Sequence, residues 1–306
     1  MEFAICLWVP DVSAESVDQL RQQGVTAIEP GPEFLLNEDE SAIVDESSRL
    51  KNAGIRIHSC HAPFSGERDL SLIDEKKREG AVATHKIALE HAAIAGASCI
   101  VIHPSGSMPP EEHEQRVDQL RRSIGELIQT AERTGVQLAL ENMPPAHVGC
   151  EAALVREMVD EFGSPFLGIC FDIGHAHLNP GGVLSAFGIL KERIITFHLQ
   201  DNDGNSDRHL QPPYGTIDWE AFRPELVDLS FKNPISVEAP PWRGAPWRVF
   251  LREINAIFDT GRLEVGFRDE RGSHQGGTIK SHIICRECGR FCFGIPEDWF
   301  CGCDGH

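Results

Sequence analysis

The sequence predicts an α/β fold, a (β/α)8 TIM barrel, from three observations. Short apolar runs alternate with amphipathic stretches, which calls for parallel strands connected by helices. The apolar runs number eight, and eight strands over about 260 residues match the usual size of this barrel. The turn after the first run reads Trp8-Val9-Pro10-Asp11. An open doubly wound sheet, the competing fold, would normally carry a glycine-rich phosphate turn there.

The elements follow from the pattern in order. The apolar and often β-branched runs, expected as strands, lie at 3–8, 26–29, 55–60, 99–103, 137–141, 167–173, 194–199 and 235–239. Between them, apolar residues recur at three- and four-residue steps, which predicts helices, as at 73–96, 111–135 and 247–260. Several helical patterns are followed directly by a glycine expected to end the helix: Gly24, Gly54, Gly96, Gly135 and Gly163.

Composition and charge narrow the class of protein. The 306 residues are 41% hydrophobic and 25% charged, as in a soluble globular protein. Lys and Arg number 28 against 47 Asp and Glu, a net charge of −19 that repels nucleic-acid backbones unless a local basic patch exists. No apolar stretch has membrane-spanning length, and the N-terminus does not read as a signal peptide. We therefore expect a cytoplasmic protein.

The C-terminal part differs from the barrel sequence. Residues 1–261 form the predicted catalytic domain, the glycine-rich stretch 262–281 reads as a linker, and 282–306 form a cysteine-rich tail. Five of the ten cysteines lie in this tail. Cys285 and Cys288, followed by a glycine, together with Cys301 and Cys303, predict a structural zinc site like that of a zinc ribbon. A disulfide or redox tail is the alternative, which a reducing cytosol disfavours.

Polar side chains stand at the end of six consecutive predicted strands. They are His61, His103, Glu141, Asp172, His198 and Glu238. The carboxyl ends of barrel strands meet at one face, where active sites of this fold lie. Each residue alone has an ordinary explanation: a histidine can be a hydrogen-bonded core residue, and Asp172 can cap the following helix. Together, however, converging carboxylates would repel one another unless a cation joined them. Mixed imidazole and carboxylate ligands suit Zn, Mn or Co.

The same residues stand in motifs that resemble a known family. The segments HAPF (61–64), VIHP (101–104), LEN (140–142), FDIGH (171–175), HLQDNDGNSDRH (198–209), GTIDW (215–219) and VEAP (237–240) are similar to those of the xylose isomerase-like TIM-barrel superfamily. It includes sugar and sugar-phosphate isomerases and epimerases and the endonuclease IV (AP endonuclease family 2) branch. The resemblance covers residues 1–260 and is more specific to the superfamily than to one reaction.

The epimerase branch implies one divalent metal held by Glu141, Asp172, His198 and Glu238. The two glutamates would then act as acid and base, moving a proton through a metal-stabilised enediolate. His175 would bind a substrate oxygen. The implied reaction is isomerisation or epimerisation of a sugar, sugar phosphate or related polyol.

The endonuclease IV branch implies a trinuclear zinc cluster. Its additional ligands correspond to His61, His103, His175, Asp207 and His209, all of which this sequence contains. An apurinic-site phosphodiesterase is therefore the alternative function, and the barrel is expected to hold between one and three ions. The loop after the third strand lacks the wedge side chains needed to flip a nucleotide, which favours the isomerase.

Other candidate contacts to the substrate are Trp8, Trp242 and Arg208. Trp242 could stack a sugar or cap the barrel, and Arg208 could bind a phosphate or form an outward salt bridge. The expected partner is a small molecule; nucleic acid stays the less favoured choice, and a homo-oligomer stays open.

Overall fold

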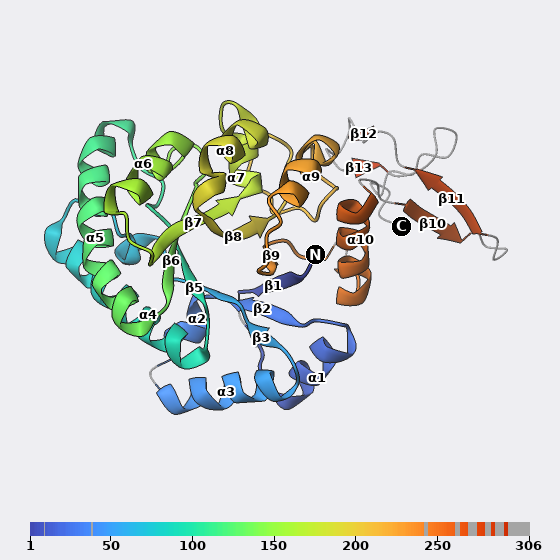
Figure 1. The fold of residues 1–306 in the computed structure, drawn as a ribbon, viewed down its shortest axis with the longest axis horizontal. Coiled ribbons are helices and arrows are strands. Elements are labelled where there is room, and N and C mark those ends of the chain that lie inside the picture. The colour runs from blue at the N-terminus through green and yellow to red at the C-terminus, as the bar shows by residue number, and fades with distance from the viewer. Residues whose placement is uncertain are drawn as a thin grey trace, which may run out of the picture.

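The structure is a computed structural model, and it describes residues 1–8, 10–37, 39–241 and 244–260, with four short strands beyond them. Central strands are surrounded by helices (Figure 1). The strands of the main sheet are β1 (Phe3–Leu7), β2 (Ala27–Pro30), β3 (Arg56–Ile57), β4 (Ser59–His61), β5 (Cys99–Ile102), β6 (Gln137–Glu141), β7 (Leu167–Asp172), β8 (Ile194–Leu199) and β9 (Ile235–Val237).

The helices connect these strands in the order the sequence predicts. They are α1 (Ala14–Gln22), α2 (Pro32–Leu35), α3 (Glu40–Asn52), α4 (Glu75–Ala95), α5 (His113–Thr134), α6 (Ala152–Phe162), α7 (Ile173–Leu178), α8 (Gly182–Leu190), α9 (Trp219–Asp228) and α10 (Trp247–Thr260), with short 3-10 turns at Gly66–Arg68, Pro110–Glu112 and Lys191–Arg193. The alternation of strands and helices confirms the TIM-barrel prediction.

The sheet is parallel, and its order runs β3-β2-β1-β9-β8-β7-β6-β5-β4. The strands at the two ends of this order, β3 and β4, are the halves of the third apolar run, separated by His58. The His58 N–H donates to the Ile28 carbonyl, and the His58 carbonyl accepts from the Ser98 N–H, both at 3.0 Å. His58 is therefore hydrogen-bonded to β2 on one side and to the residue before β5 on the other, and the sheet closes into a barrel at this point.

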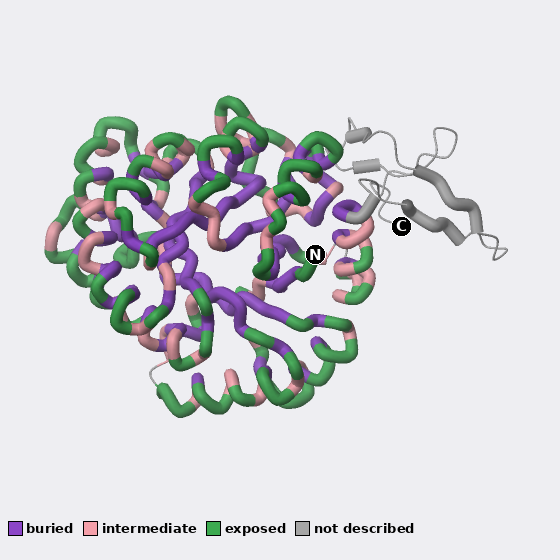
Figure 2. Tube along the Cα trace, viewed as in Figure 1, coloured by how far each residue is buried: buried purple, intermediate pink, exposed green. Residues whose placement is uncertain are grey.

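The barrel strands are buried on both faces, as a parallel sheet covered by helices requires (Figure 2). Every residue of β2, β5 and β7 is buried. These strands read as apolar runs with a polar residue at or beside the end: Glu29 is the second-last residue of β2, His103 directly follows β5, and Asp172 ends β7.

Helix ends follow the glycine signals. Helix α4 begins at the N-cap Asp74, whose side chain accepts from the Lys77 N–H at 3.0 Å. It ends at Gly96, and α5 ends at Gly135, with φ of 77° and 78° in the left-handed region. Glycine adopts this conformation without the penalty a Cβ imposes.

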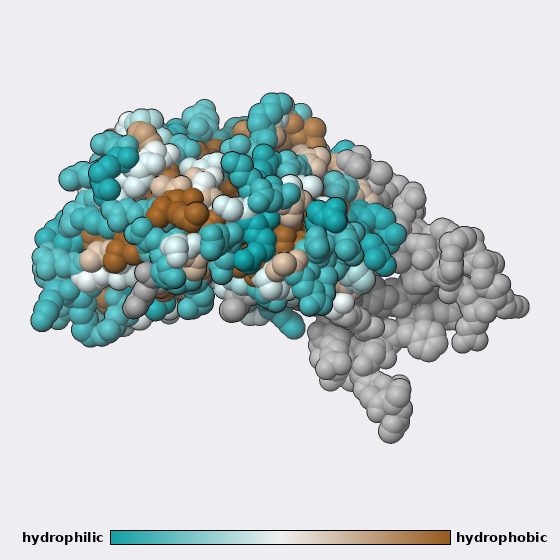
Figure 3. Space-filling view, turned by 90° about the horizontal axis from the view of Figure 1, so that it is seen from below, coloured by the Kyte–Doolittle hydropathy of each residue, from teal (hydrophilic) through white to brown (hydrophobic). Residues whose placement is uncertain are grey.

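Strands β10 (Glu264–Arg268) and β11 (His274–Thr278) pair antiparallel within the predicted linker, and β12 (Ile283–Ile284) pairs with β13 (Phe291–Cys292). The cysteines of the predicted zinc site, Cys285, Cys288, Cys301 and Cys303, lie outside the described residues. Among the residues described, no helix has the length and apolar character to cross a membrane. The face shown in Figure 3 is mainly hydrophilic, with hydrophobic side chains in small separate patches.

Candidate metal centre

Four of the predicted strand-end residues meet in one buried cluster. Glu141 ends β6, Asp172 ends β7, His198 lies in β8 and Glu238 directly follows β9. All four are buried, and one candidate ligand atom of each lies within 4.8 Å of the others. The parallel register explains this, because Asp172 pairs with His198 across β7 and β8. We call these residues the central cluster.

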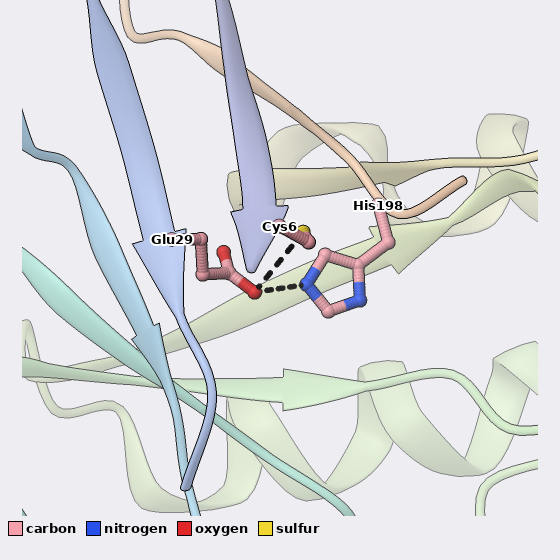
Figure 4. Close-up of side chains that lie close together, drawn as sticks. All are labelled: Cys6, Glu29 and His198. Atoms are coloured by element: carbon pink, nitrogen blue, oxygen red, sulfur yellow. Dashed lines mark hydrogen bonds and ion pairs between the residues drawn. The ribbon is translucent and has the colours of Figure 1, made fainter. Parts of the chain in front are cut away.

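The His198 ring is held on both of its nitrogens. Nδ1 lies 2.9 Å from Glu238 Oε2 and 3.1 Å from Glu141 Oε1. Nε2 faces the opposite way and lies 2.8 Å from Glu29 Oε1 (Figure 4). Nδ1 is therefore the nitrogen presented to the central cluster.

Each carboxylate of the central cluster has one buried oxygen that makes no hydrogen bond, although two of these oxygens lie at ion-pair distance from a histidine. Glu141 Oε2 is 3.1 Å from His103 Nε2, and Glu238 Oε2 is 2.9 Å from His198 Nδ1. Among the described residues, the buried side-chain atoms that make no hydrogen bond are His61 Nε2, Glu141 Oε2, Asp172 Oδ2, Gln200 Oε1 and Glu238 Oε2. An unsatisfied buried carboxylate oxygen costs about 1–3 kcal/mol or more. The three carboxylates of the cluster each carry one such oxygen. A divalent cation bound by these three oxygens would remove the cost.

Asp172 caps a helix with one carboxylate oxygen and directs the other, which makes no hydrogen bond, at the central cluster. Its Oδ1 accepts from the His175 N–H at 2.6 Å and so caps helix α7. Its Oδ2 makes no hydrogen bond and is available to the cluster. The helix cap thus fixes the orientation of the carboxylate that faces the other ligands.

The three carboxylates of the central cluster are buried close together, which makes their negative charges unfavourable without a cation. Burial raises the pKa of Asp172 to about 7, and Glu141 and Glu238 add to the rise while His175 opposes it. Burial also opposes ionisation of Glu141, but the neighbouring His198 and His103 lower its pKa well below the usual value. Every ion pair that the described residues show for these carboxylates is with a histidine.

Two predicted histidines lie beside Glu141. His103 Nε2 is 3.1 Å from Glu141 Oε2. His61, Glu141 and His198 each offer a ligand atom within 4.8 Å of the other two. His61 Nδ1 donates to the Ala62 carbonyl at 2.9 Å, which leaves the unpaired Nε2 facing inward. Burial and the nearby His103 lower the pKa of His61 to about 4, so His61 is neutral at physiological pH.

A further group lies on the loop after β8. His175 Nε2 and His209 Nε2 lie 3.2 Å and 3.1 Å from Asp207 Oδ2. His175 Nδ1 donates to the Asn142 carbonyl at 2.9 Å, and His209 Nδ1 donates to the Glu238 carbonyl at 2.8 Å. Both rings therefore turn Nε2 toward one carboxylate oxygen. We call His175, Asp207 and His209 the loop cluster.

The loop of the loop cluster is anchored by Asp201. Its buried carboxylate accepts from Trp219 Nε1 at 2.7 Å, from the Asn202 N–H at 2.8 Å and from the Ile217 N–H at 3.2 Å. Asp201 also exchanges two backbone hydrogen bonds with Leu210. These contacts join the segment 198–209 to the GTIDW segment. Gln200 connects the two clusters, because its Nε2 donates to Asp207 Oδ1 at 2.8 Å and to Asp172 Oδ1 at 3.3 Å.

The other predicted substrate contacts have mixed outcomes. Trp8 is 41% exposed, and its ring centroid lies 5.0 Å from that of His61, so it borders the site. Arg208 pairs with Asp203 at 3.3 Å on its own loop, as the salt-bridge alternative expects. Trp242 lies outside the described residues.

Sequence reasoning missed Glu29, the last residue of the second apolar run. It is 1% exposed and contacts His198 in the floor of the site. Burial opposes its ionisation, but the charge and hydrogen bond of His198 lower its pKa to about 2. The signal that could have found it is the same as for the others: a carboxylate directly after Ala27-Ile28 at a strand end.

The chain belongs to the xylose isomerase-like TIM barrel family, whose model matches residues 17–253. An uncharacterized protein of Sinorhizobium fredii is 26% identical over 260 residues, which cover 76% of this chain and 83% of that protein. The resemblance inferred from the motifs is thereby confirmed.

Relatives with assigned activities fall in two groups. A fructoselysine 3-epimerase of Escherichia coli O157:H7 is 27% identical over 175 residues, 56% of this chain and 62% of that protein. A probable endonuclease 4 of Mycoplasmopsis pulmonis is 24% identical over 236 residues, 72% of this chain and 81% of that protein. Among solved structures, a D-tagatose 3-epimerase-like protein shares the fold with a TM-score of 0.72 and 24% identity, over 85% of this chain and 99% of that one.

Proposed function

We propose that this protein is a divalent-metal-dependent isomerase or epimerase of a sugar, sugar phosphate or related polyol. The single observation that carries the proposal is the central cluster, in which three buried carboxylates converge on His198 and each keeps one oxygen that makes no hydrogen bond. The similarity to the fructoselysine 3-epimerase supports the same reaction class.

The residues present fit a divalent ion. Glu141, Asp172, Glu238 and His198 Nδ1 would hold it, a mixed set of carboxylate and imidazole ligands suited to Mn, Co or Zn. When bound, such an ion polarises a substrate carbonyl and stabilises the negative charge that develops when the neighbouring carbon loses a proton.

We infer that the two glutamates move that proton. In the sheet order β9-β8-β7-β6, Glu238 and Glu141 stand on the outer strands of four neighbours, and Asp172 and His198 lie between them. A substrate centred on the cluster would therefore have a carboxylate on each side. One can remove a proton from one face of a carbon, and the other can deliver a proton to the opposite face.

Solvent-isotope exchange tests the two-carboxylate assignment. The protein loaded with Mn²⁺ or Co²⁺ is incubated in deuterated water with a panel of free and phosphorylated ketoses, and deuterium uptake at carbon is followed by NMR. Loss of a general acid or base typically costs about 10²–10⁴-fold, so Glu141→Gln and Glu238→Gln should each slow exchange by at least about 100-fold.

Asp69→Asn is the matched control, because Asp69 is also a buried carboxylate but is bonded to Ser71, Gly106 and Arg116. It should leave exchange near the wild-type rate. If both glutamine variants exchange as fast as the wild type, the two-carboxylate mechanism is wrong.

A second candidate function is supported by the histidines and the aspartate that lie beside the central cluster. The loop cluster, together with His61 and His103 beside Glu141, offers nitrogen and oxygen ligands for ions beyond the first. Several ions can stabilise both the attacking and the leaving oxygen of a phosphodiester, so an apurinic-site phosphodiesterase is the alternative. Incubation with abasic-site duplex DNA and excess Zn²⁺ distinguishes the two. We expect no strand cleavage; clean nicking, lost in His209→Ala, would replace the first proposal with the second.

A further inference from the structure

Behind the central cluster, a second layer of contacts surrounds Glu29. Its carboxylate lies inside the barrel, on β2, and both of its oxygens are engaged. Oε1 accepts from His198 Nε2 at 2.8 Å and faces the Cys6 thiol at 3.6 Å. Oε2 accepts from the hydroxyls of Ser59 and Ser236. The contacts come from β1, β4, β8 and β9, so four different strands fix one carboxylate.

Cys6, Glu29 and His198 could themselves be taken for a metal site, because their ligand atoms lie within 4.8 Å of one another. Hydrogen bonding argues against this. Neither oxygen of Glu29 is among the buried atoms that make no hydrogen bond, whereas Glu141, Asp172 and Glu238 each contribute one. The carboxylate oxygens that make no hydrogen bond thus belong to the residues on the Nδ1 side of His198, whereas both oxygens of Glu29, on the Nε2 side, are hydrogen-bonded within the protein.

We propose that Glu29 is a positioning residue that acts through His198 and sets the affinity of the central cluster for its metal ion. The inference rests on the proposed metal-dependent function. When a metal ion takes the place of the Nδ1 proton, Glu29 would hold the remaining imidazole proton on Nε2 and leave the Nδ1 lone pair for the ion. It also fixes the ring plane and raises the basicity of the ligand nitrogen, as a carboxylate bonded to a metal-binding histidine does.

The arrangement of Glu29 supports this role over a purely structural one. A carboxylate buried to this degree is costly, and an apolar side chain would fill the same space with less penalty. The two serine hydroxyls also orient its second oxygen, so that the first stays directed at His198. Figure 4 shows one Glu29 oxygen joined by dashed lines to the Cys6 thiol and to one nitrogen of the His198 ring, with the other ring nitrogen turned away.

The test is Mn²⁺ binding to the full chain, followed by the electron paramagnetic resonance signal of the free ion. Mn²⁺ is chosen because thiolate ligands, such as the tail cysteines, bind it poorly. Outer partners of metal-binding histidines typically contribute about 10–100-fold in affinity, and Glu29→Ala should lose an amount in this range. Glu29→Gln keeps an acceptor for His198 but no charge, so its loss should be smaller than that of the alanine variant.

A spectroscopic readout separates positioning from general damage. In Zn²⁺-loaded protein with labelled histidine, the Nε2 proton of His198 should give a downfield resonance that shifts in Glu29→Gln and disappears in Glu29→Ala. Asp69→Asn, which removes the charge of another buried carboxylate, should keep both the resonance and the Mn²⁺ affinity within twofold of wild type.

The outcomes separate the two proposals. If the wild type binds no Mn²⁺, the metal-dependent function is wrong and this inference is overturned with it. If the wild type binds Mn²⁺ and the folded Glu29→Gln and Glu29→Ala variants bind it equally well, only the role of Glu29 is overturned. Graded weakening, with an unchanged Asp69→Asn control, supports the proposal.

Discussion

Hydrogen bonds fix which ring nitrogen of each histidine in the site faces the other candidate ligands. His61, His175 and His209 each donate Nδ1–H to a backbone carbonyl, at 2.8–2.9 Å, and turn Nε2 toward the other candidate ligands. His198 is reversed, with Nε2 bonded to Glu29 and Nδ1 presented inward. A ring whose outer nitrogen is already bonded has one tautomer available, and this is the usual state of a metal-binding histidine. The hydrogen bonds therefore orient these rings in the way that the proposed metal site requires.

At the residue scale, Asp172→Asn should uncouple stability from metal binding. In the metal-free protein at pH 8, the change removes a buried charge beside Glu141 and Glu238, while the amide oxygen can still cap α7. We expect the melting temperature without metal to rise or stay level, and the stabilisation by Mn²⁺ to fall strongly. Differential scanning fluorimetry with Mn²⁺ or with a chelator measures both.

The wild type should show the opposite behaviour, with a lower melting temperature in chelator than in Mn²⁺, since a ligand that binds only the folded state stabilises it. Equal stabilisation of wild type and Asp172→Asn by Mn²⁺ would remove Asp172 from the ligand set.

At the scale of elements, the loop after β8 depends on the carboxylate of Asp201. Burial raises the pKa of Asp201 to about 6, although the Trp219 indole and backbone donors oppose the rise. Because the folded-state pKa lies above the unfolded value, the stability linked to this group is complete below about pH 4 and is lost as the pH rises through about 6. The Trp219 donor limits that loss.

Trp219→Phe should therefore lower the free energy of unfolding more at high pH than at low pH. The change removes the donor to Asp201 Oδ2 and raises the pKa of Asp201 further, so the ionised form becomes less stable. We expect a loss of about 1–3 kcal/mol in the free energy of unfolding at pH 8 and a smaller loss at pH 4.5. Urea denaturation at both pH values gives the difference.

Trp247→Phe provides the comparison, because Trp247 is partly buried and its ring packs edge-on against Phe250 at 5.2 Å. The loss in the free energy of unfolding caused by Trp247→Phe should be the same at both pH values. A Trp219→Phe effect that is likewise independent of pH would contradict the role given to the Asp201–Trp219 hydrogen bond.

The elements show what local pattern can and cannot predict. Short apolar runs and glycines that follow a helical pattern define strands and helix ends locally, so β7 and the end of α4 follow from the sequence. The break at His58 does not, because it arises from hydrogen bonds to Ile28 and Ser98 on two different neighbouring segments. Closure of a barrel is a property of the whole sheet.

The residues of the central cluster could be predicted from the sequence, but the orientation of their side chains could not. Strand-end position and the family motifs identified Glu141, Asp172, His198 and Glu238. The direction of each ring was not readable, because it is set by partners far away in sequence: Glu29 is 169 residues from His198. Glu29 ends the second apolar run, which precedes the six consecutive strand ends and lies outside all the family motifs, so neither signal points to it.

At the scale of the whole molecule, charge bears on the choice between the two functions. The net charge of −19 repels a polyanion such as DNA. Binding DNA against this repulsion would require basic side chains that contact its phosphates. Arg208, the cation nearest the loop cluster in sequence, is paired with Asp203. A small sugar carries no such penalty, which agrees with the isomerase or epimerase proposal.

Metal content offers the last prediction. We propose that the tail 282–306 is a separate zinc-binding unit, because a segment this short with five cysteines has too few apolar residues for a core of its own. In the full chain, replacing Cys285 and Cys288 together by serine should lower zinc by about one ion per chain, since a structural zinc site requires all four ligands. Mn²⁺ binding at the central cluster should be unchanged. Elemental analysis of wild type and variant gives the zinc of the tail as the difference. The metal that remains in the variant then gives the number of ions in the barrel: a single ion agrees with the epimerase, three with the phosphodiesterase. Zinc content that is equal in the two proteins would show that the cysteine tail holds no structural zinc.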